Sequence, residues 1–110
     1  MDIRNTKSGK TVIAHLSGQF TYSDDKKFMD AARELVLDQP LTLAIDVSDL
    51  PHVNSTLIAA FLAILKMANE QGCEFVIYGM NPGVMSVLEK VFSSDLVPLL
   101  TEEEFMRKYL

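Results

Sequence analysis

A serine stands at the head of the most apolar segment of the chain. Residues 53–65 read VNSTLIAAFLAIL, so Asn54, Ser55 and Thr56 precede nine consecutive apolar residues. A helical step of ~100° per residue gives these side chains an amphipathic spacing, which predicts a helix from Ser55 to just before Gly72. Asn and Ser are both favoured at a helix N-cap, where the side chain accepts a backbone N–H bond. Capping is therefore the simplest role for this polar group.

The hydroxyl of Ser55 could also accept a phosphate. Phosphorylation adds roughly −1.5 to −2 charges at neutral pH. A helix N-terminus presents unpaired N–H groups and a positive dipole end to such an anion. We predict that Ser55 is a phosphorylation site, with Thr56 and Ser48 as lesser candidates.

The predicted helix has one face of large residues and one face of small ones. The residues expected to face inward are Leu57, Ile58, Phe61, Leu62, Ile64, Leu65 and Ala68. The opposite face carries Ala59, Ala63, Lys66 and Glu70, with Ser55 one turn before Ala59. Small side chains allow another protein to approach closely, so we predict a partner-binding surface on this side. Its predicted members are His52, Val53, Asn54, Ser55, Thr56, Ala59, Ala63 and Lys66.

Three carboxylates follow predicted strands. Asp46 ends a buried strand predicted over residues 41–47, and Asp24 and Asp25 follow an earlier strand. The carboxyl ends of parallel strands form one edge, where ligands of open α/β sheets usually bind. We predict that Asp46 and Asp24 orient the loops at this edge. A small-ligand or enzymatic site built on Asp46, Asp24 and Asp25 is the alternative.

The remaining reactive residue types predict neither a metal site nor a catalytic group. His15 lies in a predicted strand and His52 in a loop, without a second ligand at metal-binding spacing. Each is expected to be structural or solvated. Cys73 follows a glycine and is expected to be a small buried side chain, and one cysteine allows no internal disulfide. We therefore expect no cofactor, no metal and no enzymatic activity.

The first half of the chain supplies the elements that position the Ser55 segment. Two short strands flank a turn at residues 7–10. A helix whose start Ser23 or Asp24 can cap follows, and Pro40 ends it. The buried strand over residues 41–47 then leads into the loop before Ser55.

The second half continues the alternation of strands and helices. A strand over residues 73–79 precedes a helix that Asn81 caps, with Pro82 at its first position. A short edge strand follows at residues 96–100, and a capping box of Thr101 and Glu104 begins the last helix. The order ββαβαβαβα predicts an α/β fold with right-handed crossovers and a mixed, mostly parallel sheet.

Length and composition limit the classes of function. A chain of 110 residues, 48% of them hydrophobic, suits a single domain over residues 1–110. The net charge of −5, with ten scattered Lys and Arg, argues against binding to nucleic acid or anionic membrane surfaces. The longest apolar run is nine residues, well below the ~20 that span a bilayer, so no membrane insertion is expected. The single cysteine and the polar N-terminus indicate a cytoplasmic protein.

The sequence resembles the STAS domain family, which includes the bacterial anti-sigma-factor antagonists. The resemblance rests on Asp46-Val47-Ser48 and, after five residues, Asn54-Ser55-Thr56-Leu57-Ile58. The family pattern is Asp-x-Ser at a strand end, then Asp-Ser-[Ser/Ala/Thr]-Gly-[Leu/Ile] at the start of a helix. The likeness extends through HLSGQFTYSDDKKF and ANEQGCEFVIYGMNPGVMSVLEKVF over nearly the whole chain. Asn54 and Leu57 depart from the family's usual Asp and Gly.

The resemblance implies a function for Ser55. In the family, a partner kinase phosphorylates the serine after the Asp, and Ser55 occupies that place. The unphosphorylated antagonist binds an anti-sigma factor, which is itself that serine kinase, and a phosphatase reverses the modification. Other STAS domains are fixed, unphosphorylated subunits of transporter ATPase complexes, and the departures at Asn54 and Leu57 are compatible with this alternative. A homodimer through the alanine patch also remains open.

Overall fold

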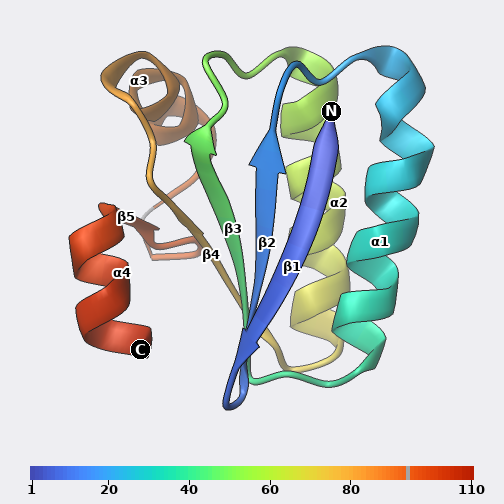
Figure 1. Cartoon of the computed structure of the whole chain (residues 1–110), viewed down its shortest axis with the longest axis vertical. Helices are drawn as coiled ribbons and strands as arrows, with labels where there is room; N and C mark the ends of the chain where they lie inside the picture. The colour runs from blue at the N-terminus through green and yellow to red at the C-terminus, as the bar shows by residue number, and fades with distance from the viewer. Residues whose placement is uncertain (94) are drawn as a thin grey trace.

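The strands lie in the sheet in the order in which they occur in the sequence. The computed structural model describes residues 1–93 and 95–110, and within them five strands form one sheet of order β1-β2-β3-β4-β5. The strands are β1 (Asp2–Ser8), β2 (Thr11–Ser17), β3 (Thr42–Asp49), β4 (Glu74–Tyr78) and β5 (Leu99–Leu100). β1 pairs antiparallel with β2, and the later neighbours pair parallel (Figure 1). The predicted α/β fold with a mixed, mostly parallel sheet is confirmed.

Local chemistry accounts for the hairpin and for the last edge strand. Ser8 pairs with Thr11, which leaves a two-residue turn in which Gly9 has a φ of 61°. This left-handed conformation suits glycine, and tight hairpins require it. At the other side of the sheet, Pro98 immediately precedes the short edge strand β5. A proline has no N–H for a central ladder, so this position agrees with the predicted edge.

Three helices cover one face of the sheet. α1 (Asp25–Leu37), α2 (Ser55–Glu70) and α3 (Pro82–Val91) connect successive parallel strands. Right-handed crossovers between strands that are neighbours in sequence order put such helices on the same face. Figure 1 shows α1 and α2 side by side on one side of the sheet and α4 (Glu102–Tyr109) on the other. The main core lies between the three-helix layer and the inward side chains of β2, β3 and β4, which include Val12, Leu16, Leu43, Ile45, Phe75 and Ile77.

A second, smaller core lies on the opposite face of the sheet. Alternate strand residues Ile13, Ala44, Val76 and Tyr78 meet Phe105 of α4 there. The Phe105 ring stacks on the Tyr78 ring with centroids 4.0 Å apart and planes 2° from parallel. The last helix therefore covers the β4 side of this face.

Most of the predicted helix ends are present. Asn81 caps α3 by accepting a bond from Val84 N at 2.8 Å, and Pro82 is the first residue of this helix. Thr101 and Glu104 form the predicted capping box of α4. Gly72, with a φ of 69°, follows the C-cap residue of α2.

The start of the first helix differs from the prediction. A short 3₁₀ turn, η1 (Tyr22–Asp24), precedes α1, and Thr21 is its N-cap. The Asp24 carboxylate accepts bonds from Thr21 N at 2.7 Å and Thr21 Oγ1 at 2.9 Å. Since this carboxylate bonds back toward Thr21, neither Ser23 nor Asp24 caps α1 with its side chain.

Candidate functional site

Asn54 begins α2 and fixes its position in the molecule. Its Oδ1 accepts a hydrogen bond from Leu57 N at 2.9 Å, and its backbone is extended, as expected of an N-cap residue. Its Nδ2 donates to the carbonyl oxygen of Phe20 at 2.9 Å. One side chain therefore caps α2 and also joins the β3–α2 loop to the loop after β2.

Ser55 is the first residue of α2 and is exposed. Because Asn54 supplies the cap, the Ser55 hydroxyl is not needed for this role. None of the hydrogen bonds recorded among the described residues involves that hydroxyl. Thr56, next in the helix, is half-buried, and Leu57 is fully buried.

The outer face of α2 is more apolar than the sequence predicts. Ala59, Ala63 and Lys66 are exposed, and Leu57, Phe61, Ile64 and Ala68 are buried. Leu62, predicted to face inward, is instead 45% exposed. α2 packs against α1 and β4, and the seven residues predicted to face inward span a wider arc than these two neighbours cover. The exposed face, here called the α2 face, consists of Ser55, Ala59, Leu62, Ala63 and Lys66.

The β3–α2 loop is fixed from α3 as well as from Asn54. Asn81 Nδ2 donates to the carbonyl oxygens of Leu50 at 3.4 Å and Pro51 at 3.2 Å. His52 is exposed and Val53 is half-buried. His52 lines two surface hollows, one with Gly18, Gln19 and Pro51, and one with Pro51, Val53, Gly83, Val84 and Val87. The loop therefore presents His52 beside the start of α2.

Asp46 lies inside a strand and faces away from the helix layer. β3 runs to Asp49, two residues beyond the predicted end. Asp46 Oδ2 lies 2.6 Å from His15 Nδ1, and Asp46 Oδ1 accepts bonds from Ser48 N at 2.9 Å and Ser48 Oγ at 2.6 Å. His15 Nε2 lies 3.0 Å from Thr6 Oγ1. Four polar residues from β1, β2 and β3 thus form one hydrogen-bonded row, here called the polar row.

The polar row sets the ionisation of its carboxylate. Burial alone would raise the pKa of Asp46, but the Ser48 hydrogen bonds and the His15 bond and charge outweigh burial and lower it. Burial is the main cause that raises the pKa of Tyr78, and the charge of Asp46 raises it further. An ionised Asp46 can only accept hydrogen bonds, so His15 must carry its proton on Nδ1.

The structure does not bring the predicted carboxylates together. Asp24 bonds with Thr21 and with the N-terminal amine of Met1, 3.4 Å away, at the start of α1. Asp46 bonds with His15 and Ser48 on the opposite face of the sheet. Among the described residues, no three His, Cys, Asp or Glu side chains gather in a way that could bind a metal ion. Asp24 therefore holds the turn before α1, and Asp46 holds the end of β3.

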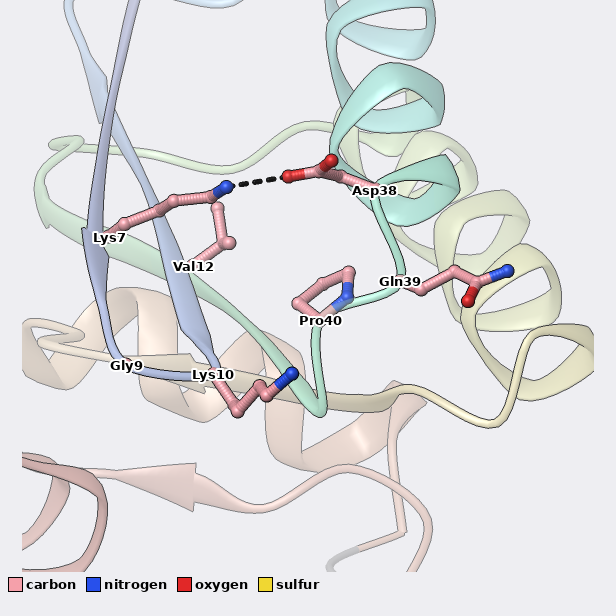
Figure 2. A pocket seen from close by; sticks show the side chains of 7 residues that line it. All are labelled: Lys7, Gly9, Lys10, Val12, Asp38, Gln39 and Pro40. Carbon is pink, nitrogen blue, oxygen red and sulfur yellow. Dashed lines mark hydrogen bonds and ion pairs between the residues drawn. The ribbon is translucent and has the colours of Figure 1, made fainter.

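A hollow also exists at the opposite end of the sheet. Figure 2 shows it beside the β1–β2 turn, with Lys7, Lys10 and Pro40 among its lining residues. Lys7 Nζ donates to Asp38 Oδ2 at 2.6 Å, so this hollow is bordered by an ion pair. It lies far from the start of α2, which is at the other end of the strands (Figure 1).

The His15–Asp46 pair is the feature that sequence reasoning missed. The two residues are direct partners in the parallel register of β2 and β3. A signal was present, because TVIAHLS and TLAIDVS align residue for residue and each has one polar interruption at the same position. Two such interruptions in neighbouring strands predict side chains that meet on the same face.

None of the described helices is both long enough and apolar enough to cross a membrane. A comparison with curated proteins gives no match.

Solved structures share the fold over nearly the whole chain. A putative anti-sigma factor antagonist from Thermotoga maritima has a TM-score of 0.84 and 18% identity, covering 96% of this chain and 92% of that chain. An anti-sigma factor antagonist from Mycobacterium paratuberculosis has a TM-score of 0.83 and 16% identity, with 96% and 91% covered. The phosphorylated form of the Bacillus cell fate determinant SpoIIAA has a TM-score of 0.77 and 13% identity, with 99% and 100% covered. At identities this low, the structural likeness shows a shared fold alone.

The sequence itself matches a family model. The model described as "Mlab, STAS domain" matches residues 3–98, which include β1 from its second residue, β2 to β4, and α1 to α3. This range contains Asp46, Ser48, Asn54 and Ser55, the residues on which the sequence resemblance rests. With the ββαβαβαβα order and the described helix start at Asn54, the match shows that the chain belongs to the STAS family.

Proposed function

We propose that this chain is a binding module of the anti-sigma-factor-antagonist kind and that phosphorylation of Ser55 controls it. The observation that carries the proposal is the position of Ser55. Ser55 is exposed at the first position of α2, and Asn54 rather than Ser55 caps the helix. Ser55 also adjoins the exposed apolar residues Ala59 and Leu62. The proposal assigns binding rather than catalysis to the chain.

The proposed partner is an anti-sigma factor that is also a serine kinase, and both act in the cytoplasm. It would contact the α2 face together with His52, Val53, Asn54 and Thr56. The alanines of this face leave room for a close approach, and Leu62 offers apolar area to bury. A phosphatase would restore the unphosphorylated form.

The helix start explains why the protein itself would tolerate a phosphate on Ser55. The first backbone N–H groups of a helix have no partner within the helix. The Leu57 N–H donates to Asn54 Oδ1, and the N–H groups of Ser55 and Thr56 remain for a phosphate. The positive end of the helix dipole adds further stabilisation. The modification would therefore leave the fold intact.

The same phosphate would weaken an apolar complex. It adds roughly −1.5 to −2 charges to a chain whose net charge is already −5. A charge pressed into an apolar interface loses its hydration, and a loss of ~3 kcal/mol lowers affinity on the order of 100-fold. A change of this size is sufficient for a binding switch.

The hydroxyls of the lesser candidates are less free to accept a phosphate. Thr56 is half-buried, and the Ser48 hydroxyl donates to Asp46 at 2.6 Å. Modification of Ser48 would remove one of the hydrogen bonds of the polar row. Ser55 is therefore the preferred acceptor.

A kinase assay tests the modification. The chain is incubated with a serine kinase of the anti-sigma type and ATP, and its mass is measured. We expect one added phosphate on the wild type and on Ser48→Ala, and none on Ser55→Ala. Phosphate that persists on Ser55→Ala would assign the modification to another residue and overturn the proposal.

A binding assay tests the switch with a matched charge control. Ser55→Asp is compared with Ser86→Asp, which adds the same charge at an exposed position of α3. Ser55→Asp should lower affinity for the kinase strongly, whereas Ser86→Asp should leave it nearly unchanged. Equal affinities for both variants would contradict control by charge at Ser55.

The second candidate function is a fixed subunit of a transporter ATPase complex. It is favoured by the uncharged Asn54 and by Leu57, which is fully buried where the family usually has glycine. Such a subunit would use the same α2 face without modification. A tight complex with an ATPase that is insensitive to Ser55→Asp but lost in Leu62→Asp would support this function over the switch.

A further inference from the structure

The polar row connects an edge strand to the loop that carries Ser55. It runs from Thr6 in β1 through His15 in β2 to Asp46 and Ser48 in β3, in contacts of 2.6 to 3.0 Å. The His15 and Asp46 side chains are 22% and 14% exposed. Each is thus shielded from most solvent yet close enough to the surface to exchange protons.

Asp46 determines where Ser48 lies. The same carboxylate oxygen, Oδ1, accepts both the backbone N–H and the hydroxyl of Ser48. Gly79 closes the other side, because a Cβ there would lie 3.1 Å from Ser48 Cβ and 3.2 Å from Asp46 Oδ1. Ser48 is therefore confined between a carboxylate and a backbone.

The position of Ser48 in turn sets the entrance to the β3–α2 loop. Leu50 N donates to Val47 O at 3.0 Å, which forms a tight turn around Ser48. The next carbonyls, those of Leu50 and Pro51, are bonded by Asn81. A displacement of Ser48 would thus be passed along a short, bonded segment toward Val53.

His15 has hydrogen bonds on both ring nitrogens in either protonation state. When it is neutral, Nδ1–H donates to Asp46 and Nε2 accepts from the Thr6 hydroxyl. When it is protonated, Nε2–H donates to Thr6, and the bond to Asp46 becomes charge-assisted and stronger. Protonation therefore strengthens the pull of His15 on Asp46, the carboxylate that holds Ser48, while both ring nitrogens stay bonded.

Charged groups of both signs surround His15. Arg4 lies directly opposite in β1, and Asp2 lies one pair further along the same face of that strand. Asp46 lies opposite His15 in β3, and Tyr78 lies beyond Asp46 in β4. After burial and Asp46, the charge of Glu102 in α4 also raises the pKa of Tyr78. Of these charged groups, Asp46 is the one that makes a recorded hydrogen bond with the His15 ring.

We propose that His15 is a positioning residue for the β3–α2 loop, that it acts through Asp46 and Ser48, and that protonation of His15 changes the conformation of this loop. This goes beyond the proposed function, because it concerns how the loop is held whether or not Ser55 is modified. It makes the surface at the start of α2 depend on the contact between His15 and Asp46.

Nuclear magnetic resonance can follow the coupling in two single-histidine proteins. The chain has two histidines, so His52→Asn leaves His15 as the titrating ring, and His15→Asn leaves His52. In His52→Asn, the Ser48 and Val53 amide signals should shift with the same midpoint as the His15 ring. In His15→Asn, the shift at Ser48 should vanish, because Asn can donate to Asp46 but does not titrate.

Val53 separates a conformational change from a through-space field. It lies five residues beyond Ser48, so a field effect confined to the polar row would move Ser48 alone. A Val53 signal that does not follow the His15 midpoint in His52→Asn would overturn the proposal.

Hydrogen exchange provides the readout for positioning. In His15→Ala, protection of the Ser48 amide should fall on the order of tenfold, and His15→Asn should restore most of it. Unchanged protection in His15→Ala would refute the positioning role. If His15→Ala does not fold, the Val53 signal in His52→Asn decides: a shift at the midpoint of the His15 ring would support the proposal, and its absence would refute it.

Discussion

Asn54 and Phe20 join the two loops at the end of the sheet where α2 begins. Asn54 Nδ2 donates to the carbonyl oxygen of Phe20 at 2.9 Å, and Oδ1 of the same side chain caps α2 through Leu57 N. Asn81 repeats this arrangement at α3, where it caps through Val84 N and donates to the carbonyls of the β3–α2 loop. An asparagine serves both purposes because its amide carries a donor and an acceptor.

Replacing Asn54 should separate the stability that comes from the helix cap from that of the Phe20 hydrogen bond. Asn54→Ala loses the cap and the Phe20 bond, and we expect a loss of about 2 kcal/mol in the free energy of unfolding. Asn54→Asp, which introduces the usual family residue, keeps the cap but replaces the donor by an oxygen facing the Phe20 carbonyl. It should cost at least about 1 kcal/mol by urea unfolding. An Asn54→Asp protein as stable as the wild type would show that the Phe20 bond contributes nothing.

Two glycines with positive φ provide a matched test of close packing. Gly79 has a φ of +83° and would place a Cβ against Ser48 and Asp46, whereas Gly9 has a φ of +61° with nothing within 4 Å. Gly9→Ala should therefore lower the free energy of unfolding by about 1 kcal/mol, through backbone strain alone. Gly79→Ala should cost about 1 to 3 kcal/mol more, because Ser48 must also move. Equal losses in thermal or urea unfolding would contradict the packing of Gly79 against the polar row.

The stability of the second core should depend on the Phe105 side chain. This ring is fully buried and stacks on Tyr78, whose pKa burial and Asp46 raise. Phe105→Ala should reduce the free energy of unfolding by about 3 to 5 kcal/mol, and Phe105→Leu by much less, since it fills most of the space. Unfolding in urea measures both. A small loss for Phe105→Ala would mean that α4 adds little stability to the sheet.

Asp46 should make stability depend on pH in the acid range. Hydrogen bonds from Ser48 and His15 outweigh burial and lower its folded pKa below the ordinary value. A lowered carboxyl pKa contributes stability that is complete above the unfolded pKa, about 4, and is lost as pH falls through the folded pKa. The wild type should therefore exceed Asp46→Asn in stability at pH 7 by a margin that shrinks below pH ~4. A margin that stays constant down to pH ~2 would contradict the lowered pKa.

Local signals accounted for the elements that the sequence predicted well. Asn81 with Pro82, and Thr101 with Glu104, predict helix starts from residues within one turn, and the structure has all of them. The alternation of strands and helices likewise predicts the mostly parallel sheet.

The features that the sequence did not predict depend on contacts between distant segments. The inward prediction for Leu62 failed because a helical wheel does not show how much of a helix its neighbours cover. Thr21 was missed as a cap because a 3₁₀ turn, rather than α1 itself, begins there. The His15–Asp46 contact joins residues 31 positions apart, and it follows from the pairing register of β2 and β3.

The β1–β2 turn lies at the far end of the sheet from α2's first residue, with Lys10 exposed beside it (Figures 1 and 2). Cys73, the single cysteine of the chain, is buried, and burial raises the pKa of its thiol. A thiol-reactive fluorophore would therefore attach selectively to Lys10→Cys. Such a labelled protein can be immobilised or observed from one end while a partner approaches freely from the other.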